Sequence, residues 1–184
     1  MSQGLKIAVV GSALAALAFA TPAVAEELTV EMHLISKEGV GKSIGTAHAS
    51  DTDNGLLLKL DLAAELSPGP HGFHVHENPS CEPAMKDGEP VAGLAAGGHF
   101  DPEGTGKHMG PSGTGHLGDL PVIYVEVDED GALPVRRPLL APRLKVADLR
   151  GRSLVIHAQG DNYRDEPEPL GGGGARVACG VVPE

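Results

Sequence analysis

The stretch GHFDPEGTGKHMGPSGTGHLGD, residues 98–119, collects four possible metal ligands in a segment that is unsuited to regular structure. Glycine occupies six positions between 104 and 118, and proline occupies 102 and 111; both residues favour turns over helix or strand interiors. The possible ligands are His99, His108, His116 and Asp119. Three imidazoles and a carboxylate form a tetrahedral set suited to zinc, and ligand bonds would supply ordering energy that hydrophobic burial does not. The alternative is a disordered linker that happens to contain histidines.

Two further segments each add histidines to apolar strand-like runs. In GFHVHE, residues 72–77, strand alternation sends His74 and His76 to one face, so that their rings converge. In SLVIHA, residues 153–158, an apolar run ends near His157. If these three met one histidine from the loop, the result would be a four-nitrogen site of the kind that suits copper(II). The sequence therefore predicts two metal sites.

With these motifs in place, the chain resembles the copper,zinc superoxide dismutases, and most closely their bacterial secreted branch. The resemblance runs in order through most of the chain. The matching runs are HGFHVHE at 71–77, GGHFDP at 97–102, KHMGPSGTGHLGDLP at 107–121, GRSLVIHAQGDN at 151–162 and GGGGARVACGV at 171–181.

The resemblance implies a ligand set for each metal, with His99 as a bridge between copper and zinc. Copper would be held by His74, His76, His99 and His157, and zinc by His99, His108, His116 and Asp119. The implied reaction is the disproportionation of superoxide to dioxygen and hydrogen peroxide, which would protect the cell envelope. Copper would exchange the electron, zinc would hold the loop, and His99 would supply a proton.

Two residues are expected to serve the reaction without binding metal. Asp161 follows His157 by four positions and could accept hydrogen bonds from ligand imidazoles; by resemblance it would link His74 to His108. Arg176 would present a fixed cation and a fork of donors to a small anion such as superoxide. The alternative for Arg176 is an ordinary surface arginine.

The rest of the chain predicts short strands separated by turns. Asn54-Gly55 is a strong hairpin signal, and no segment sustains a long helical period. This pattern indicates an all-β, antiparallel sandwich or barrel. The Greek-key, immunoglobulin-like architecture with long metal-binding loops follows from the resemblance. The predicted strands outside the histidine motifs are 28–35, 45–49, 56–62, 122–127 and 133–140.

Residues 1–25 are typical of a cleaved secretory signal. Lys6 precedes an apolar run, and Ala23-Val24-Ala25 forms a small-residue cleavage pattern before Glu26. The alternative is an uncleaved anchor, although the run is short for a membrane span. Residues 26–184 would then be a single exported domain, with the periplasm as the expected location. The net charge of −11 argues against nucleic acid or an acidic membrane surface as a partner.

Cys81 and Cys179 are the only cysteines, and an even count in an exported protein favours a disulfide. Closing a loop of this size would stabilise the fold by about 4–5 kcal/mol in the chain-entropy model. Two free buried thiols are the alternative. Thiol ligation of a metal is disfavoured because the histidine sets already close both sites.

Three histidines are left out of the predicted ligand sets. His33 and His48 are expected at the surface or in structural roles, and strand alternation places His71 on the face opposite His74. The main rival function is an exported copper and zinc carrier or chaperone without turnover. A zinc hydrolase would need an open zinc position and a general base. Whether the protein is a monomer or a homodimer is left open.

Overall fold

The structure is a computed structural model that describes Met1 and residues 26–184. The predicted secretory signal therefore lies, apart from Met1, outside the described residues. Within the part of the chain that is described, no helix is long and apolar enough to cross a membrane.

Strands, turns and irregular loops make up nearly all of residues 26–184, and helix is confined there to three short pieces, α1 and two 3-10 turns. The elements are β1 (Glu27–Ser36), β2 (Gly39–Thr52), β3 (Gly55–Leu62), β4 (Gly69–His71), β5 (Phe73–His76), β6 (Ala84–Lys86), β7 (Glu89–Val91), η1 (Leu94–Ala96), β8 (Ile123–Val125), β9 (Val127–Asp128), β10 (Gly131–Ala132), β11 (Val135–Ala141), α1 (Val146–Leu149), β12 (Ser153–His157), η2 (Pro169–Gly172) and β13 (Arg176–Val181).

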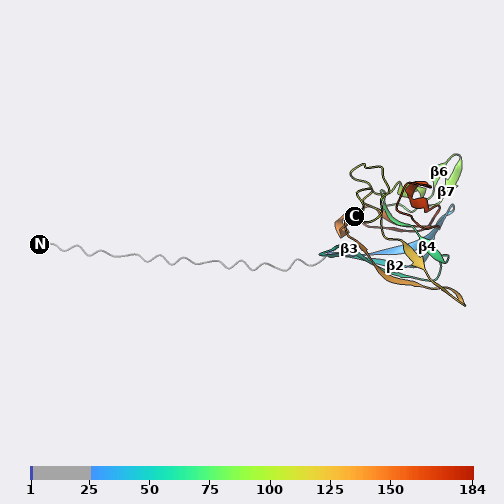
Figure 1. The fold of residues 1–184 in the computed structure, drawn as a ribbon, viewed down its shortest axis with the longest axis horizontal. Coiled ribbons are helices and arrows are strands. Elements are labelled where there is room, and N and C mark those ends of the chain that lie inside the picture. The colour runs from blue at the N-terminus through green and yellow to red at the C-terminus, as the bar shows by residue number, and fades with distance from the viewer. Residues whose placement is uncertain (2–25) are drawn as a thin grey trace.

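One antiparallel sheet of seven strands forms the body, in the order β11-β3-β2-β1-β13-β12-β5. Because neighbours in this order are often far apart in sequence, long connections must cross from one part of the sheet to another. Figure 1 shows the long strands crossing the body, with the irregular segments and the β6–β7 hairpin gathered on one side. The prediction of an all-β antiparallel fold is confirmed.

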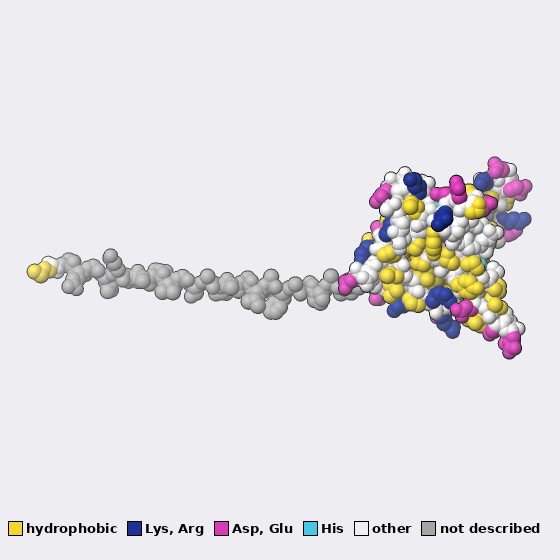
Figure 2. Space-filling view, in the orientation of Figure 1, with side chains coloured by type: hydrophobic (Ala, Val, Ile, Leu, Met, Phe, Trp, Pro, Cys, Tyr) yellow, Lys and Arg dark blue, Asp and Glu magenta, His cyan; other side chains and the backbone are white. Residues whose placement is uncertain are grey.

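The core forms because alternate residues of the long strands point inward. In β3, Leu56, Leu58, Leu60 and Leu62 are all buried, whereas Lys59 and Asp61 are exposed. Their period of two is what a strand with one solvated face requires. Figure 2 shows that hydrophobic side chains also gather in the middle of the face it presents, with charged side chains mostly at its edges and corners.

The predicted hairpin turn at Asn54-Gly55 is confirmed, since β2 and β3 pair from Thr52 and Gly55 onward. Gly55 has a φ of 116° and its missing Cβ would lie 2.6 Å from Ala141 O, so only glycine fits there. Strand limits were less well predicted. The 45–49 segment belongs to the much longer β2, and the 122–127 segment is divided between β8 and β9.

Candidate metal centre

The central element of the site is β5, which is paired on both of its edges. One edge pairs with β12, with His74 opposite Val155. The other edge pairs with the two ends of the 98–119 loop through isolated bridges, His74 with Asp119 and His76 with His99. The loop is therefore fixed at both ends to the strand that carries two of the predicted ligands.

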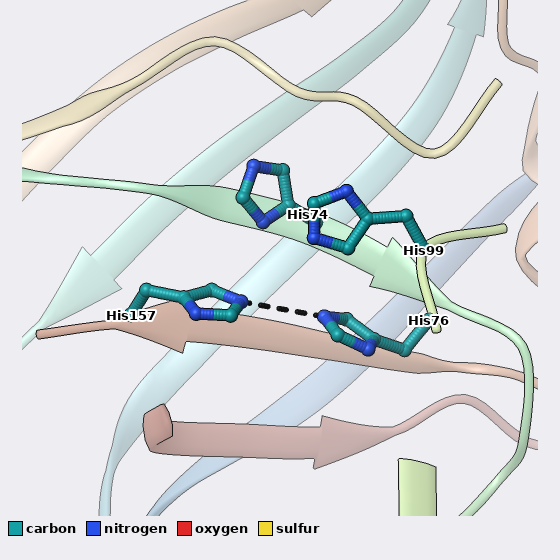
Figure 3. Close-up of side chains that lie close together, drawn as sticks. All are labelled: His74, His76, His99 and His157. Carbon is teal, nitrogen blue, oxygen red and sulfur yellow. Dashed lines mark hydrogen bonds between the residues drawn. The ribbon is translucent and has the colours of Figure 1, made fainter. Parts of the chain in front are cut away.

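The first cluster contains His74, His76, His99 and His157, all of them buried. Their ligand atoms lie within 4.8 Å of one another. Nε2 of His76 lies 3.4 Å from Nε2 of His157, and the rings of His74 and His99 stack with centroids 3.9 Å apart. Figure 3 shows the four rings converging on one point from β5, β12 and the loop.

The outward nitrogens of three of these rings are held by hydrogen bonds. His76 Nδ1 donates to Gly97 O at 3.0 Å, and His157 Nδ1 donates to Gly174 O at 3.1 Å. His74 Nε2 lies 2.7 Å from Asp161 Oδ2. Such bonds fix the tautomer of each ring, so that the opposite nitrogen is free to bind a metal.

The second cluster surrounds Asp119. Its Oδ1 lies 3.0 Å from His108 Nδ1, 3.2 Å from His99 Nδ1 and 3.4 Å from His116 Nδ1. A tetrahedral site with zinc bonds of about 2.0–2.2 Å would separate neighbouring ligand atoms by about 3.3–3.6 Å. Asp119 Oδ2 points away and accepts from Met109 N–H and Gly110 N–H, at 3.1 and 3.0 Å.

Orphaned nitrogens provide a test of whether metals fit these clusters. His74 Nδ1, His108 Nδ1 and His116 Nδ1 are buried without a hydrogen-bond partner among the described residues. A buried polar atom normally has a partner, and cations bound at the two clusters would satisfy all three. The group of mutually close ligand atoms around Asp119 contains His74, His99 and His108. His116 is not in that group, and it contacts the cluster through Asp119.

Asp161 connects the two clusters, in agreement with its expected geometry. Its Oδ2 lies 2.7 Å from His74 Nε2 and its Oδ1 lies 2.8 Å from His108 Nε2. Gly171 packs directly against this carboxylate, because a Cβ on Gly171 would lie 2.0 Å from Asp161 Oδ1. The φ of Gly171 is 74°, so glycine is needed there for two separate reasons.

Burial keeps the first cluster free of protons. Burial, reinforced by His99, lowers the pKa of His74 to about 3, and burial lowers the pKa of His157 to about 4. The pKa of His108 moves the other way: burial opposes its protonation, but the contacts with Asp119 and Asp161 raise the pKa to about 9. Neutral imidazoles are the form that binds metal.

The metal-free protein is therefore expected to lose stability as the pH falls from about 6.5 to about 4.5. Unfolded imidazoles titrate near 6.5, so in this range the unfolded chain binds protons that the folded His74 and His157 do not, and acid favours unfolding. His108 contributes no slope here, because its stabilising protonation is already complete below about 6.5.

Denaturant unfolding of chelator-treated protein at several pH values would measure this effect. Carboxylates add to the loss only at the acid end of the range, because their unfolded forms titrate near pH 4, so the change between pH 6.5 and about 5.5 reports the imidazoles. A free energy of unfolding that stays constant, or rises, toward pH 4.5 would contradict the expectation.

Arg176 lies at the start of β13 and is anchored by the segment before the loop. Its Nη1 donates to Gly93 O at 2.5 Å and its Nη2 donates to Gly97 O at 2.6 Å. Gly97 O is also the acceptor for His76 Nδ1. The guanidinium is therefore held next to the first cluster, and burial lowers its pKa.

The predicted disulfide is confirmed. Cys81 and Cys179 are bonded, with their Cα atoms 5.7 Å apart. They pack in a small core with Ile35, Ala96 and Val155. The bond ties the segment that anchors Arg176 to β13, three residues from Arg176 itself.

A hollow of about 490 Å³ lies beside His157, at one edge of the first cluster. His157 contributes to its lining, together with Gln159, Glu168, Leu170 and the glycines at 172–174. Glu168 brings a carboxylate to this opening. An anion that enters must therefore be attracted by charges deeper in the site.

The structure brings all seven predicted ligands into one connected centre and places the other three histidines outside it. His71 bonds the carbonyls of Ser67 and His157, and His48 contacts two threonine hydroxyls on the exposed sheet face. His33 contacts Gly41 O and Glu31 on the same strand pair.

Three supporting contacts were not predicted. Asp165 accepts from His108 N–H at 3.0 Å. Glu77 accepts from Gly98 N–H at 2.8 Å, directly before His99. Arg143 binds carbonyls of the loop. Glu77 ends the HGFHVHE motif at 71–77, so the sequence contained a signal for it. Asp165 and Arg143 lie in no motif that would have indicated their contacts.

The fold and the site together define a class of protein, an antiparallel β-protein with two adjoining buried groups of close ligand atoms that have His74 and His99 in common. Comparison with known families narrows this class. The family described as copper/zinc superoxide dismutase (SODC) matches residues 43–182. The chain belongs to the copper/zinc superoxide dismutase family.

Individual relatives agree with this membership. Superoxide dismutase (Cu-Zn) 2 of Salmonella typhimurium is 55% identical over 154 residues, which cover 83% of this chain and 86% of the relative. The structure of the Cu/Zn superoxide dismutase from Brucella abortus has a TM-score of 0.80 and 52% identity, covering 85% of this chain and 99% of that one. A structure described as the monomeric enzyme from Salmonella enterica has a TM-score of 0.72 and 53% identity, with the same coverage.

Proposed function

We propose that this protein is a superoxide dismutase that converts two superoxide anions and two protons into dioxygen and hydrogen peroxide. The observation that carries the proposal is that His99 lies between the two clusters. Like His74 it belongs to both groups of mutually close ligand atoms, and its Nδ1 lies 3.2 Å from Asp119 Oδ1. A single imidazole can bind a metal through each ring nitrogen, so the two clusters form one coupled centre.

The ligand types favour a different metal at each cluster. His74, His76, His99 and His157 offer four nitrogens, which suit copper. The second set offers three imidazoles and one carboxylate, which suit a closed tetrahedral zinc site; its members are His99, His108, His116 and Asp119. Copper, when bound, supplies reversible one-electron exchange, which zinc does not.

Arg176 is proposed to bind the substrate. Two of its N–H groups are fixed on Gly93 O and Gly97 O, which aims the rest of the planar cation beside the copper cluster. A guanidinium stays charged even when burial lowers its pKa. A small anion that reaches the copper cluster would meet this fixed charge.

His99 is proposed to deliver one proton to the product. Its Nδ1 faces Asp119 at 3.2 Å, so Nε2 is the nitrogen that faces the copper cluster. Burial lowers the pKa of His99, although Asp119 opposes this. A proton held at Nε2 is therefore readily given up to a departing peroxide.

Local charge has to overcome the acidity of the whole chain. The net charge is −11, and Glu168 lies at the opening of the hollow. A fixed cation and bound metal ions at the bottom of a concave site can still focus an anion toward it. Superoxide dismutase is a standard example of such steering.

The protein is proposed to work after export, with residues 26–184 as the mature domain in the periplasm. The disulfide supports an oxidising compartment, and the signal-like residues 1–25 support secretion. Monomer and homodimer both stay predictions, which light scattering of the purified domain would separate.

The experiment that tests the function is the rate of superoxide disproportionation per bound copper, measured on residues 26–184 loaded with both metals. A fast rate that falls as salt is raised is expected, since salt screens a steered anion. Tight copper binding with a negligible rate would make the protein a carrier or chaperone, and the metal ligands would stand without the enzyme.

A further inference from the structure

His116 is held differently from its neighbours around Asp119. His108 has a second ring contact, with Asp161, and Asp119 is fixed by two backbone N–H groups. Within residues 26–184, the His116 ring has no hydrogen bond, and its sole polar contact is the 3.4 Å approach of Nδ1 to Asp119. Apart from packing against the rings of His99 and His108, the position of this ring is therefore set by its backbone.

The backbone of His116 is fixed on both of its polar sides. Its N–H donates to Lys107 O at 2.8 Å, which joins the two halves of the loop. Its carbonyl accepts from Arg143 Nη1 at 3.1 Å, and the preceding carbonyl, that of Gly115, accepts from Arg143 Nη2 at 3.0 Å. The backbone of Gly115 is packed closely against that of Lys107, because a Cβ on Gly115 would lie 2.2 Å from Lys107 O.

Arg143 reaches the loop from a separate part of the fold. It lies between β11 and α1, 27 residues beyond His116, and its side chain is half-buried. Its two terminal nitrogens bind two consecutive carbonyls, an arrangement that suits the rigid planar fork of donors of a guanidinium. Neither nitrogen contacts a carboxylate in the described residues, so the contact serves the loop backbone rather than an ion pair.

We propose that Arg143 is a positioning residue for zinc: it fixes the backbone of Gly115 and His116, so that His116 Nδ1 faces the same point as the other three ligands. This inference rests on the zinc ligands proposed above. Residues that orient metal ligands typically contribute 10–100-fold in metal affinity. Because the hydrogen bonds of the Arg143 side chain go to the loop backbone and not to the copper cluster, its effect is selective for zinc.

The test compares Arg143→Ala and Arg143→Lys with Arg136→Ala in the metal-free domain. Arg136 is the matched control, since it lies on β11 and forms an exposed ion pair with Asp61 at 3.0 Å. Zinc affinity is measured by competition with a chelator, cobalt(II) absorption reports the geometry of the zinc site, and copper affinity is titrated separately. Thermal unfolding without metal records any general loss of stability.

Arg143→Ala is expected to weaken zinc binding by about 10-fold or more and to change the cobalt(II) spectrum, with copper affinity unchanged. Arg143→Lys, which keeps the charge but not the fork, is expected to lose part of this affinity, and Arg136→Ala none. If Arg143→Ala does not fold, the zinc affinity and cobalt(II) spectrum of Arg143→Lys test the proposal.

Unchanged zinc affinity and an unchanged cobalt spectrum would overturn the proposal, even if the thermal stability of the metal-free protein fell. Equal losses of zinc and copper would overturn it as well, because they would mark Arg143 as a general structural residue. If the unsubstituted domain binds no zinc, the proposed zinc site itself is wrong. Failure of the zinc site can therefore be told apart from failure of the proposal for Arg143.

Discussion

Asp161→Ala is expected to weaken both metal sites at once, by about 10- to 100-fold each. The carboxylate holds His74 on one side and His108 on the other, at 2.7 and 2.8 Å. Burial would raise the pKa of Asp161, but the contacts with His108 and His74 lower it, so the group accepts as a carboxylate. Chelator-competition titrations of copper and zinc on the metal-free domain would measure both losses.

Two companion variants make this result specific. Glu166→Gln removes a charge from the same segment, where the side chain is exposed, and both affinities are expected to stay within about twofold, the level of an ordinary surface change. Asp161→Asn keeps one acceptor oxygen but presents N–H groups to the other imidazole, so one site should weaken more than the other. A loss confined to a single metal in Asp161→Ala would show that the carboxylate does not couple the sites.

Arg176→Ala is expected to slow superoxide disproportionation by about tenfold or more at low salt, with copper and zinc still bound. The substitution removes the guanidinium that is fixed by Gly93 O and Gly97 O beside the copper cluster. The rate of the variant should also depend less steeply on salt concentration, because part of the charge that attracts the anion has been removed. The measurement is the rate per bound copper over a range of ionic strength.

Arg176→Lys provides the comparison for charge without geometry. It retains a cation but cannot bind both carbonyls with one planar group, so an intermediate rate is expected. Metal content has to be measured in both variants, since Gly97 O also orients His76. Full activity in Arg176→Ala with both metals present would remove Arg176 from the mechanism.

Much of the site could be predicted because its ligands occur in short motifs with a definite local geometry. Alternation in a strand is enough to place His74 and His76 on one face. A glycine-rich loop with three histidines and an aspartate indicates a metal site wherever it is found in the fold. The family resemblance then added the shared His99 and the link through Asp161, which spacing alone does not give.

Other features depend on contacts that no local pattern encodes. Asp165 and His108 are 57 residues apart, and Arg143 and His116 are 27 apart. In each case an ordinary surface-type residue gains a role only because a distant segment brings a backbone group within hydrogen-bonding distance.

The sequence by itself determined the strand content, the hairpin at Asn54-Gly55 and the identity of the seven candidate ligands, because these follow from periodicity, turn chemistry and ligand type. Only the tertiary structure decided the strand order, the pairing of β5 with both ends of the loop, and the support given by Arg143 and Asp165. The physical reason is that hydrophobic patterning specifies which face of a strand is buried, whereas the partner on each edge is chosen by the packing of the whole chain.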